Sequence, residues 1–219
     1  MGKIMLENIV QTEKESAEFE KYKALKGEYL YKQVSDILFE LDGKPASYSD
    51  VSSIIRYDKN LRDTLFIYLA TFEESLRAEL FRKYDVGSAD HVYRYLKGFK
   101  KLKNDIRSKD SSDSSNLYFC FELELGHMIE LLKHLGLYSR ETISGFKKIK
   151  DLRNHVMHHN MITLGRAKNI SDFRDNFALL QRQICMLKDN LPNEYQLGFI
   201  GDINKLPCKR KEFKIILEK

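Results

Sequence analysis

The chain has 219 residues, of which 42% are hydrophobic and 32% are charged, and its formal net charge at pH 7 is +5. This length and apolar content predict one domain, or one domain with an appendage, with a substantial buried core. Three prolines, eleven glycines and many Leu, Lys and Glu residues favour helices. The positive charge is compatible with a phosphate-rich partner, and it favours an acidic substrate over a basic one.

The three cysteines, Cys120, Cys185 and Cys208, form no CxxC pair. An odd and scattered set argues against a disulfide framework and against a cysteine-based metal site, and it indicates a reducing compartment. No apolar run approaches the length of a membrane span, and the apolar stretch at the N-terminus is too short for a secretory signal. The sequence therefore predicts a soluble cytoplasmic protein with no membrane partner.

Apolar residues recur at helical spacing through the first part of the chain. Residues 3–25 are predicted as a helical arm with a patchy apolar face, and residues 30–41 as a second helix that Gly43 and Pro45 stop. Ser49 is expected to cap a short turn, and the clearest helix should run from about Asp58 to Tyr84. The stripe of that helix is interpreted as core and needs no cofactor; it comprises Leu61, Leu65, Tyr68, Leu69, Phe72, Leu76 and Leu80.

A basic stretch with interleaved aromatic residues follows at residues 91–110. Its cations are Lys97, Lys100, Lys101, Lys103, Arg107 and Lys109, and its rings are Tyr93, Tyr95 and Phe99. Cations neutralise phosphates and rings stack on bases, so this stretch is a candidate RNA-binding surface. It can equally be a solvated helix face whose aromatic residues are buried, and both interpretations stay open.

The second half of the chain starts after a Ser- and Asp-rich segment, residues 108–116, which is predicted as a loop. A helix is expected over residues 117–135, a second one after the cap Ser139, and a last long helix after the cap Ser171. The inward residues of the last helix are Phe173, Phe177, Leu180, Ile184, Leu187 and Leu191. After Pro192 the helical pattern dissolves, which predicts a tail without catalytic residues that can dock on the body.

Half of the six histidines lie in one short segment, residues 151–160, which reads DLRNHVMHHN. On an ideal helix Asn154 and His158 share a face, and His155 and His159 share the neighbouring face. Arg153 and His158 are about 140° apart around the axis, so both can border one groove. Two copies in a symmetric dimer would place two Arg and two His around one cleft.

This residue set suits cleavage of RNA without a metal ion or another cofactor. A histidine can take the proton from a ribose 2′-OH or give one to the departing 5′-oxygen. Arg153 can hold the scissile phosphate and neutralise the charge that grows in the transition state, and Asn154 can orient Arg153 or donate to a phosphate oxygen. The products would be a 2′,3′-cyclic phosphate and a 5′-hydroxyl.

The cluster allows two other interpretations. His155, His158 and His159, with Asp151, have spacings that can bind a metal ion, but no HExxH motif is present and no Glu lies between the histidines. The cluster can also be a polar helix end whose histidines cap carbonyl groups. A separate functional hypothesis is an inactive RNA-binding module that holds a structured small RNA on the basic stretch.

The string Arg153-Asn154-x-x-x-His158-His159 resembles the R-x(4–6)-H signature of HEPN domains, in the form found in Abi-like (abortive infection) proteins. Two further stretches are similar to that family: residues 57–84, with the E-x-S-L-R run at Glu73–Arg77, and LELGHMIELL at Leu123–Leu132. The resemblance covers about residues 28–190. Two departures are Met157, where a small residue is common, and the lack of an Arg-Leu pair after His159.

The resemblance implies an all-α HEPN-type helical bundle over residues 28–190, with an N-terminal helical arm at 1–27 and a C-terminal tail at 191–219. It implies a homodimer in which two motifs form a composite ribonuclease site. Arg153 and His158 would be the catalytic pair, Asn154 their polar neighbour and His159 the reserve candidate. Such proteins act in phage defence or as toxins of toxin–antitoxin pairs, so we expect RNA as substrate, a small RNA or a protein as antitoxin, and no DNA partner.

Overall fold

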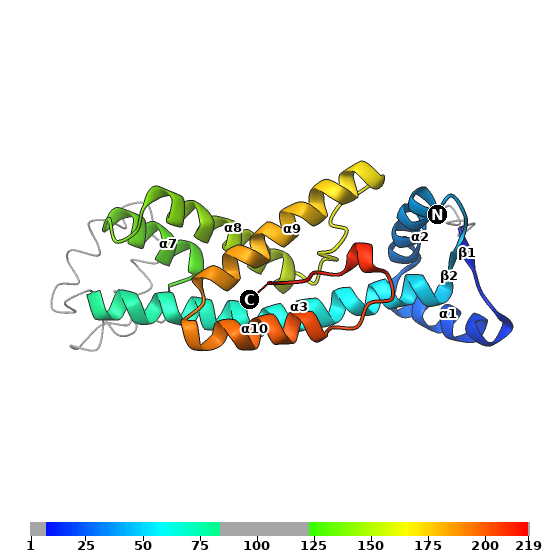
Figure 1. The fold of residues 1–219 in the computed structure, drawn as a ribbon, viewed down its shortest axis with the longest axis horizontal. Helices are drawn as coiled ribbons and strands as arrows, with labels where there is room; N and C mark the ends of the chain where they lie inside the picture. Colours follow the sequence, from blue (N-terminus) through cyan, green and yellow to red (C-terminus); the bar gives the residue numbers. More distant parts are fainter. Residues whose placement is uncertain (1–7, 84–122, 219) are drawn as a thin grey trace, which may run out of the picture.

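The computed structural model describes residues 8–83 and 123–218, and in these ranges it is almost entirely helical (Figure 1). The predicted all-α fold class is confirmed. The helices are α1 (Glu13–Lys26), α2 (Glu28–Asp42), α3 (Tyr48–Lys83), α7 (Leu125–His134), α8 (Arg140–Met157), α9 (Ile170–Asn190), α10 (Asn193–Lys205) and the short 3₁₀ helix η1 (Lys211–Phe213). Two two-residue strands, β1 (Ile9–Val10) and β2 (Ala46–Ser47), pair in parallel.

Helix α3 is the longest of the described helices and runs along most of the length of the molecule (Figure 1). It has 36 residues and contacts α2, α7, α8, α9 and α10. The expected break between a turn at Ser49 and a helix from Asp58 is wrong, because one helix starts at Tyr48. Val51 and Ile54 are fully buried in phase with Leu61, and neither glycine nor proline interrupts residues 46–83, so nothing ends the first turns.

The N-terminal arm packs on the body through one ring. Thr12 and Glu15 form a reciprocal capping box that starts α1, and Phe19 is the buried residue of this helix. Phe19 contacts the rings of Tyr31 and Tyr48 edge-on, with centroids 5.4 and 5.5 Å away. The predicted helix over residues 3–25 is too long: Ile9 and Val10 are a strand, and residues 1–7 lie outside the described part of the chain.

Several predicted helix boundaries are confirmed and one is displaced. Gly43 ends α2 in the left-handed conformation (φ +68°), and the Ser139 hydroxyl caps α8 by accepting from the backbone N–H of Thr142 at 3.2 Å. Helix α9 is capped by Asn169, which accepts from Asp172 N–H at 2.9 Å, and not by Ser171. The six residues predicted to face inward from α9 are all buried.

The region after Pro192 is more ordered than its pattern indicated. Helix α10 occupies Asn193–Lys205 and buries Phe199, Ile200 and Ile203 against α3 and α9, so the predicted loss of helix is wrong. Two glycines, Gly198 and Gly201, lower the helical propensity of this segment, but packing overrides them. The following tail docks on the body, as the sequence allowed, and its buried side chains are Phe213, Ile215 and Leu217.

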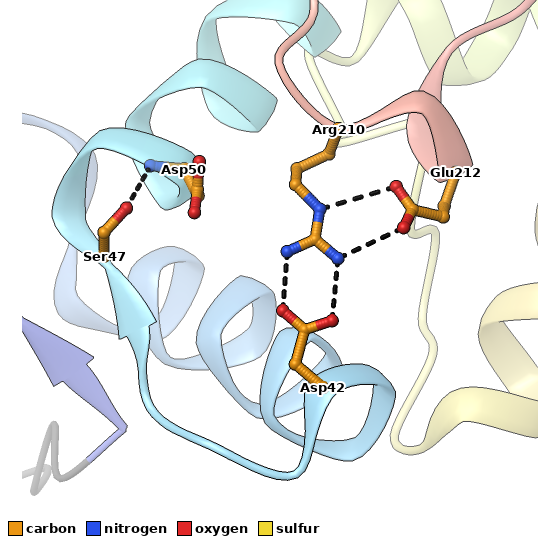
Figure 2. A network of polar contacts seen from close by, with 5 residues as sticks. All are labelled: Asp42, Ser47, Asp50, Arg210 and Glu212. Carbon is orange, nitrogen blue, oxygen red and sulfur yellow. Dashed lines mark hydrogen bonds and ion pairs between the residues drawn. The ribbon is translucent and has the colours of Figure 1, made fainter.

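An ion-pair network fastens the tail to the end of α2 (Figure 2). The Arg210 guanidinium donates to both carboxylate oxygens of Asp42, at 2.6 and 2.9 Å, and also to Glu212 at 3.2 Å. The hydrogen bonds from Arg210 lower the pKa of the Asp42 carboxyl below its usual value. Because a bidentate pair fixes direction as well as distance, this network holds the tail at Arg210 against the end of α2.

Within residues 8–83 and 123–218, none of the helices combines the length and the apolar character that crossing a membrane requires.

Candidate functional site

Helix α8 positions the Arg-Asn-His cluster at its C-terminal end. Its buried face, which includes Leu152 and Val156, packs on the core, while Arg153 and Asn154 are half-buried and His155 is exposed. The helix ends at Met157. The ideal helix assumed from the sequence therefore stops before His158 and His159, and both of these side chains are exposed in the turn that follows.

That turn is a Schellman motif, in which two backbone bonds close the helix end. His159 N–H donates to Val156 O at 3.1 Å, and Asn160 N–H donates to His155 O at 3.3 Å. The geometry requires the left-handed conformation at His159, whose φ is +54°. Glycine usually occupies this position, because a residue with a Cβ pays about 1–2 kcal/mol there. Such strain is often stored at functional sites.

Arg153 lines a groove of about 220 Å³ between α3 and α8. Its Nε lies 3.8 Å from Glu73 Oε2, and Glu73 also pairs with Arg77 at 3.3 Å. Arg77 in turn donates to the backbone carbonyl of Leu123 at 3.2 Å, just before α7. In the sequence Glu73 belongs to the E-x-S-L-R run, and the structure places its carboxylate beside Arg153.

His155 and His159 line a second and larger groove, of about 1010 Å³. Residues on a helix are rotated by about 100° each, so Asn154 separates the Arg153 side from the His155 side. The cap residue His158 keeps near-helical backbone angles (φ −85°, ψ 8°) and donates its N–H to Asn154 O at 3.0 Å, so it extends the Asn154 face. One chain thus places Arg153 in one groove and His155 with His159 in another, with the half-buried Asn154 and the exposed His158 between them.

The segment that follows the cluster is anchored by a buried carboxylate, Asp58 on α3. Asp58 Oδ1 accepts from the backbone N–H groups of Ile162 and Thr163, both at 2.8 Å, and from the Thr163 hydroxyl at 2.9 Å. Its Oδ2 pairs with Arg62 Nε at 2.9 Å. Burial raises the pKa of Asp58, and these donors oppose that rise. The sequence signal that was missed is a carboxylate in phase with the apolar stripe of α3.

The remaining predicted site residues fall into two groups. The basic stretch, with Lys97, Lys100, Lys101, Lys103, Arg107 and Tyr95, lies outside the described residues. For the metal interpretation, His155, His158 and His159 do not converge: in the described ranges no three His, Cys, Asp or Glu side chains are grouped so that they could hold a metal ion.

Comparison of the chain with protein-family models, with curated proteins and with solved structures finds no match.

Proposed function

We propose that this chain is a metal-independent endoribonuclease of the HEPN type, acting in phage defence by abortive infection or as the toxin of a toxin–antitoxin pair. One observation carries the proposal: Arg153, paired with Glu73, lies at the same end of α8 as the half-buried Asn154 and the exposed His158. A cation and an exposed imidazole at one helix end are the two kinds of group that general acid–base cleavage of a phosphodiester needs.

In the proposed reaction His158 removes the proton from the ribose 2′-OH. The resulting oxygen attacks the adjacent phosphorus, the bond to the 5′-oxygen breaks, and a general acid protonates that leaving oxygen. Arg153 neutralises the charge that develops on the phosphate. At 3.8 Å its contact with Glu73 is an ion pair and not a hydrogen bond, so the Nε donor is not committed to the carboxylate. Asn154 is placed to hydrogen-bond a phosphate oxygen.

The general acid that protonates the leaving oxygen would come from a second copy of the chain. In one chain His155 and His159 lie across Asn154 from Arg153, so a symmetric pair of α8 ends would complete the site. The groove around Arg153 supports a homodimer, because it is rimmed by exposed apolar side chains, among them Phe66 (49% exposed) and Met157 (41% exposed). Exposed apolar side chains gathered beside a functional group are typical of protein interfaces.

Phe66→Glu should convert the dimer into a monomer and reduce RNA cleavage at least tenfold, because the new charge would be buried against its symmetry mate. Size-exclusion chromatography with light scattering and a cleavage assay measure both effects. Leu197→Glu, on α10 and 70% exposed, is the matched control and should change neither. A monomeric Phe66→Glu protein with full activity would contradict the composite site.

The chemistry is tested directly with RNA substrates. The protein should produce a 2′,3′-cyclic phosphate and a 5′-hydroxyl, and cleavage should be unaffected by EDTA. A substrate with a single 2′-deoxy residue on the 5′ side of the cleaved bond should resist cleavage at that bond, because it lacks the attacking hydroxyl. Mass spectrometry of the products distinguishes this pathway from hydrolysis to a 3′-hydroxyl and a 5′-phosphate, which would reject the proposed mechanism.

A further inference from the structure

The larger groove is strongly basic. Four cations and two imidazoles line it: Lys26, Arg62, Arg166, Lys168, His155 and His159. They come from the end of α1, from α3, from the end of α8 and from the segment between α8 and α9. The acidic side chain among the described lining residues is Asp58, which is buried and already bonded to Arg62 and to the backbone of Ile162 and Thr163. The groove therefore presents a net positive field to solvent.

Lys26 lies among other positive charges. Desolvation lowers the pKa of Lys26, and so do the positive charges of Lys59, Arg56 and Arg62. A like-charge cluster of this kind costs folding free energy that a bound anion would recover.

An aromatic ring lies among these charges. Tyr29, near the start of α2, is 67% exposed and lines the same groove. Exposed rings inside a basic groove are characteristic of proteins that bind single-stranded nucleic acid, because bases stack on the ring while cations contact the phosphates. The volume of about 1010 Å³ is at the upper end of small-molecule sites, which span about 300–1,000 Å³, so more than one nucleotide can enter.

The backbone of His159 is a further sign that this groove has a function. His159 takes up the strained left-handed conformation at a position where glycine would relieve the strain. The strained turn places the His159 imidazole in the groove that His155 also lines. A bound ligand that contacts this imidazole would offset the cost of the strain.

We propose that this groove, with Lys26, Arg62, Arg166, Lys168, His155 and His159, binds the sugar–phosphate backbone of single-stranded RNA while Tyr29 stacks on a base. The strand would pass from the groove to the neighbouring face with Asn154 and the exposed His158, which places the proposed chemistry at the groove's edge. The inference extends the nuclease function proposed above, but it requires only binding, so it can be tested without cleavage.

The probe is a labelled 2′-O-methyl oligouridine of about 12 nucleotides, within the size range of single-strand sites, and it cannot be cleaved because it lacks a free 2′-hydroxyl. Fluorescence anisotropy at several salt concentrations measures its affinity. The double variant Arg166→Glu/Lys168→Glu should bind at least tenfold more weakly, and its log–log salt slope should fall by about 0.7 per lost phosphate contact. The control Lys205→Glu/Lys211→Glu changes the net charge equally on exposed residues outside the groove and should bind as the parent does.

Two further variants separate binding from folding. Tyr29→Ala should weaken binding about tenfold, whereas Tyr195→Ala, an exposed tyrosine on α10, should not. His159→Gly removes an imidazole and relieves the left-handed strain, so affinity should fall while the melting temperature stays equal or rises. Three results would each overturn the proposal. The Arg166/Lys168 variant could bind the oligouridine as tightly as the parent, or the Lys205/Lys211 control could lose as much affinity as that variant. The parent could also bind uridine monophosphate as tightly as the oligouridine. Absence of RNA cleavage with groove-dependent binding intact would reject the nuclease function alone.

Discussion

Asp58→Ala should lower the free energy of unfolding by about 3–5 kcal/mol, the cost of breaking a buried ion pair by removing one partner. The variant would leave the Ile162 and Thr163 N–H groups and the Thr163 hydroxyl without their acceptor, and Arg62 without its carboxylate. Because domains are stable by only about 5–15 kcal/mol, this single change would remove a large part of the total. Urea unfolding followed by circular dichroism measures it.

Asp63→Ala is the matched control on the same helix. Asp63 is exposed and pairs with Lys59 at 3.3 Å, and such surface pairs contribute about 0–1 kcal/mol. Asp58→Asn should be milder than Asp58→Ala, because the amide oxygen can still accept from the residue 162–163 backbone and because burial already disfavours the ionised acid, as its raised pKa indicates. Equal stability of the Asp58→Ala and Asp63→Ala proteins would show that Asp58 is not the anchor of this segment.

His158→Ala and Arg153→Ala should each reduce RNA cleavage at least 100-fold while the fold survives. A positioned acid–base group contributes about 100- to 10,000-fold, and removal of a transition-state charge donor costs a similar factor. His158 is exposed and makes its helix-capping bond through the backbone, so its imidazole can be removed without disturbing α8. Single-turnover cleavage at saturating RNA measures the loss, and an unchanged melting curve excludes unfolding.

His159→Ala distinguishes the two candidate bases. His159 lines the basic groove, so its loss should raise KM more than it lowers kcat, whereas the loss of His158 should lower kcat. His134→Ala, an exposed histidine on α7, controls for loss of an imidazole elsewhere and should be fully active. Cleavage that persists in both the Arg153 and His158 variants but stops with EDTA would favour a metal-dependent reaction instead.

Local sequence was sufficient for the helices whose signals are local. The Gly43 stop and the Ser139 cap act within one turn, and the apolar stripe of α9 is read directly from its spacing. The same local rules failed at α10, where Gly198 and Gly201 weaken the helix that burial of Phe199 and Ile203 restores. They also failed at the start of α3, where an unbroken buried face outweighs the cap signal of Ser49.

The sequence by itself determined the residue types of the candidate site: an arginine, an asparagine and three histidines within seven positions. Helix spacing already pairs Asn154 with His158 and His155 with His159, but only the tertiary structure decided what these faces meet: Arg153 lies against α3, and His155 and His159 line the larger groove. The same holds for the Glu73 contact with Arg153 and for the bonds from Asp58 to residues 162 and 163. These partners are 80 to 105 positions apart, and a spacing pattern limited to one or two helical turns carries no information about contacts at that separation.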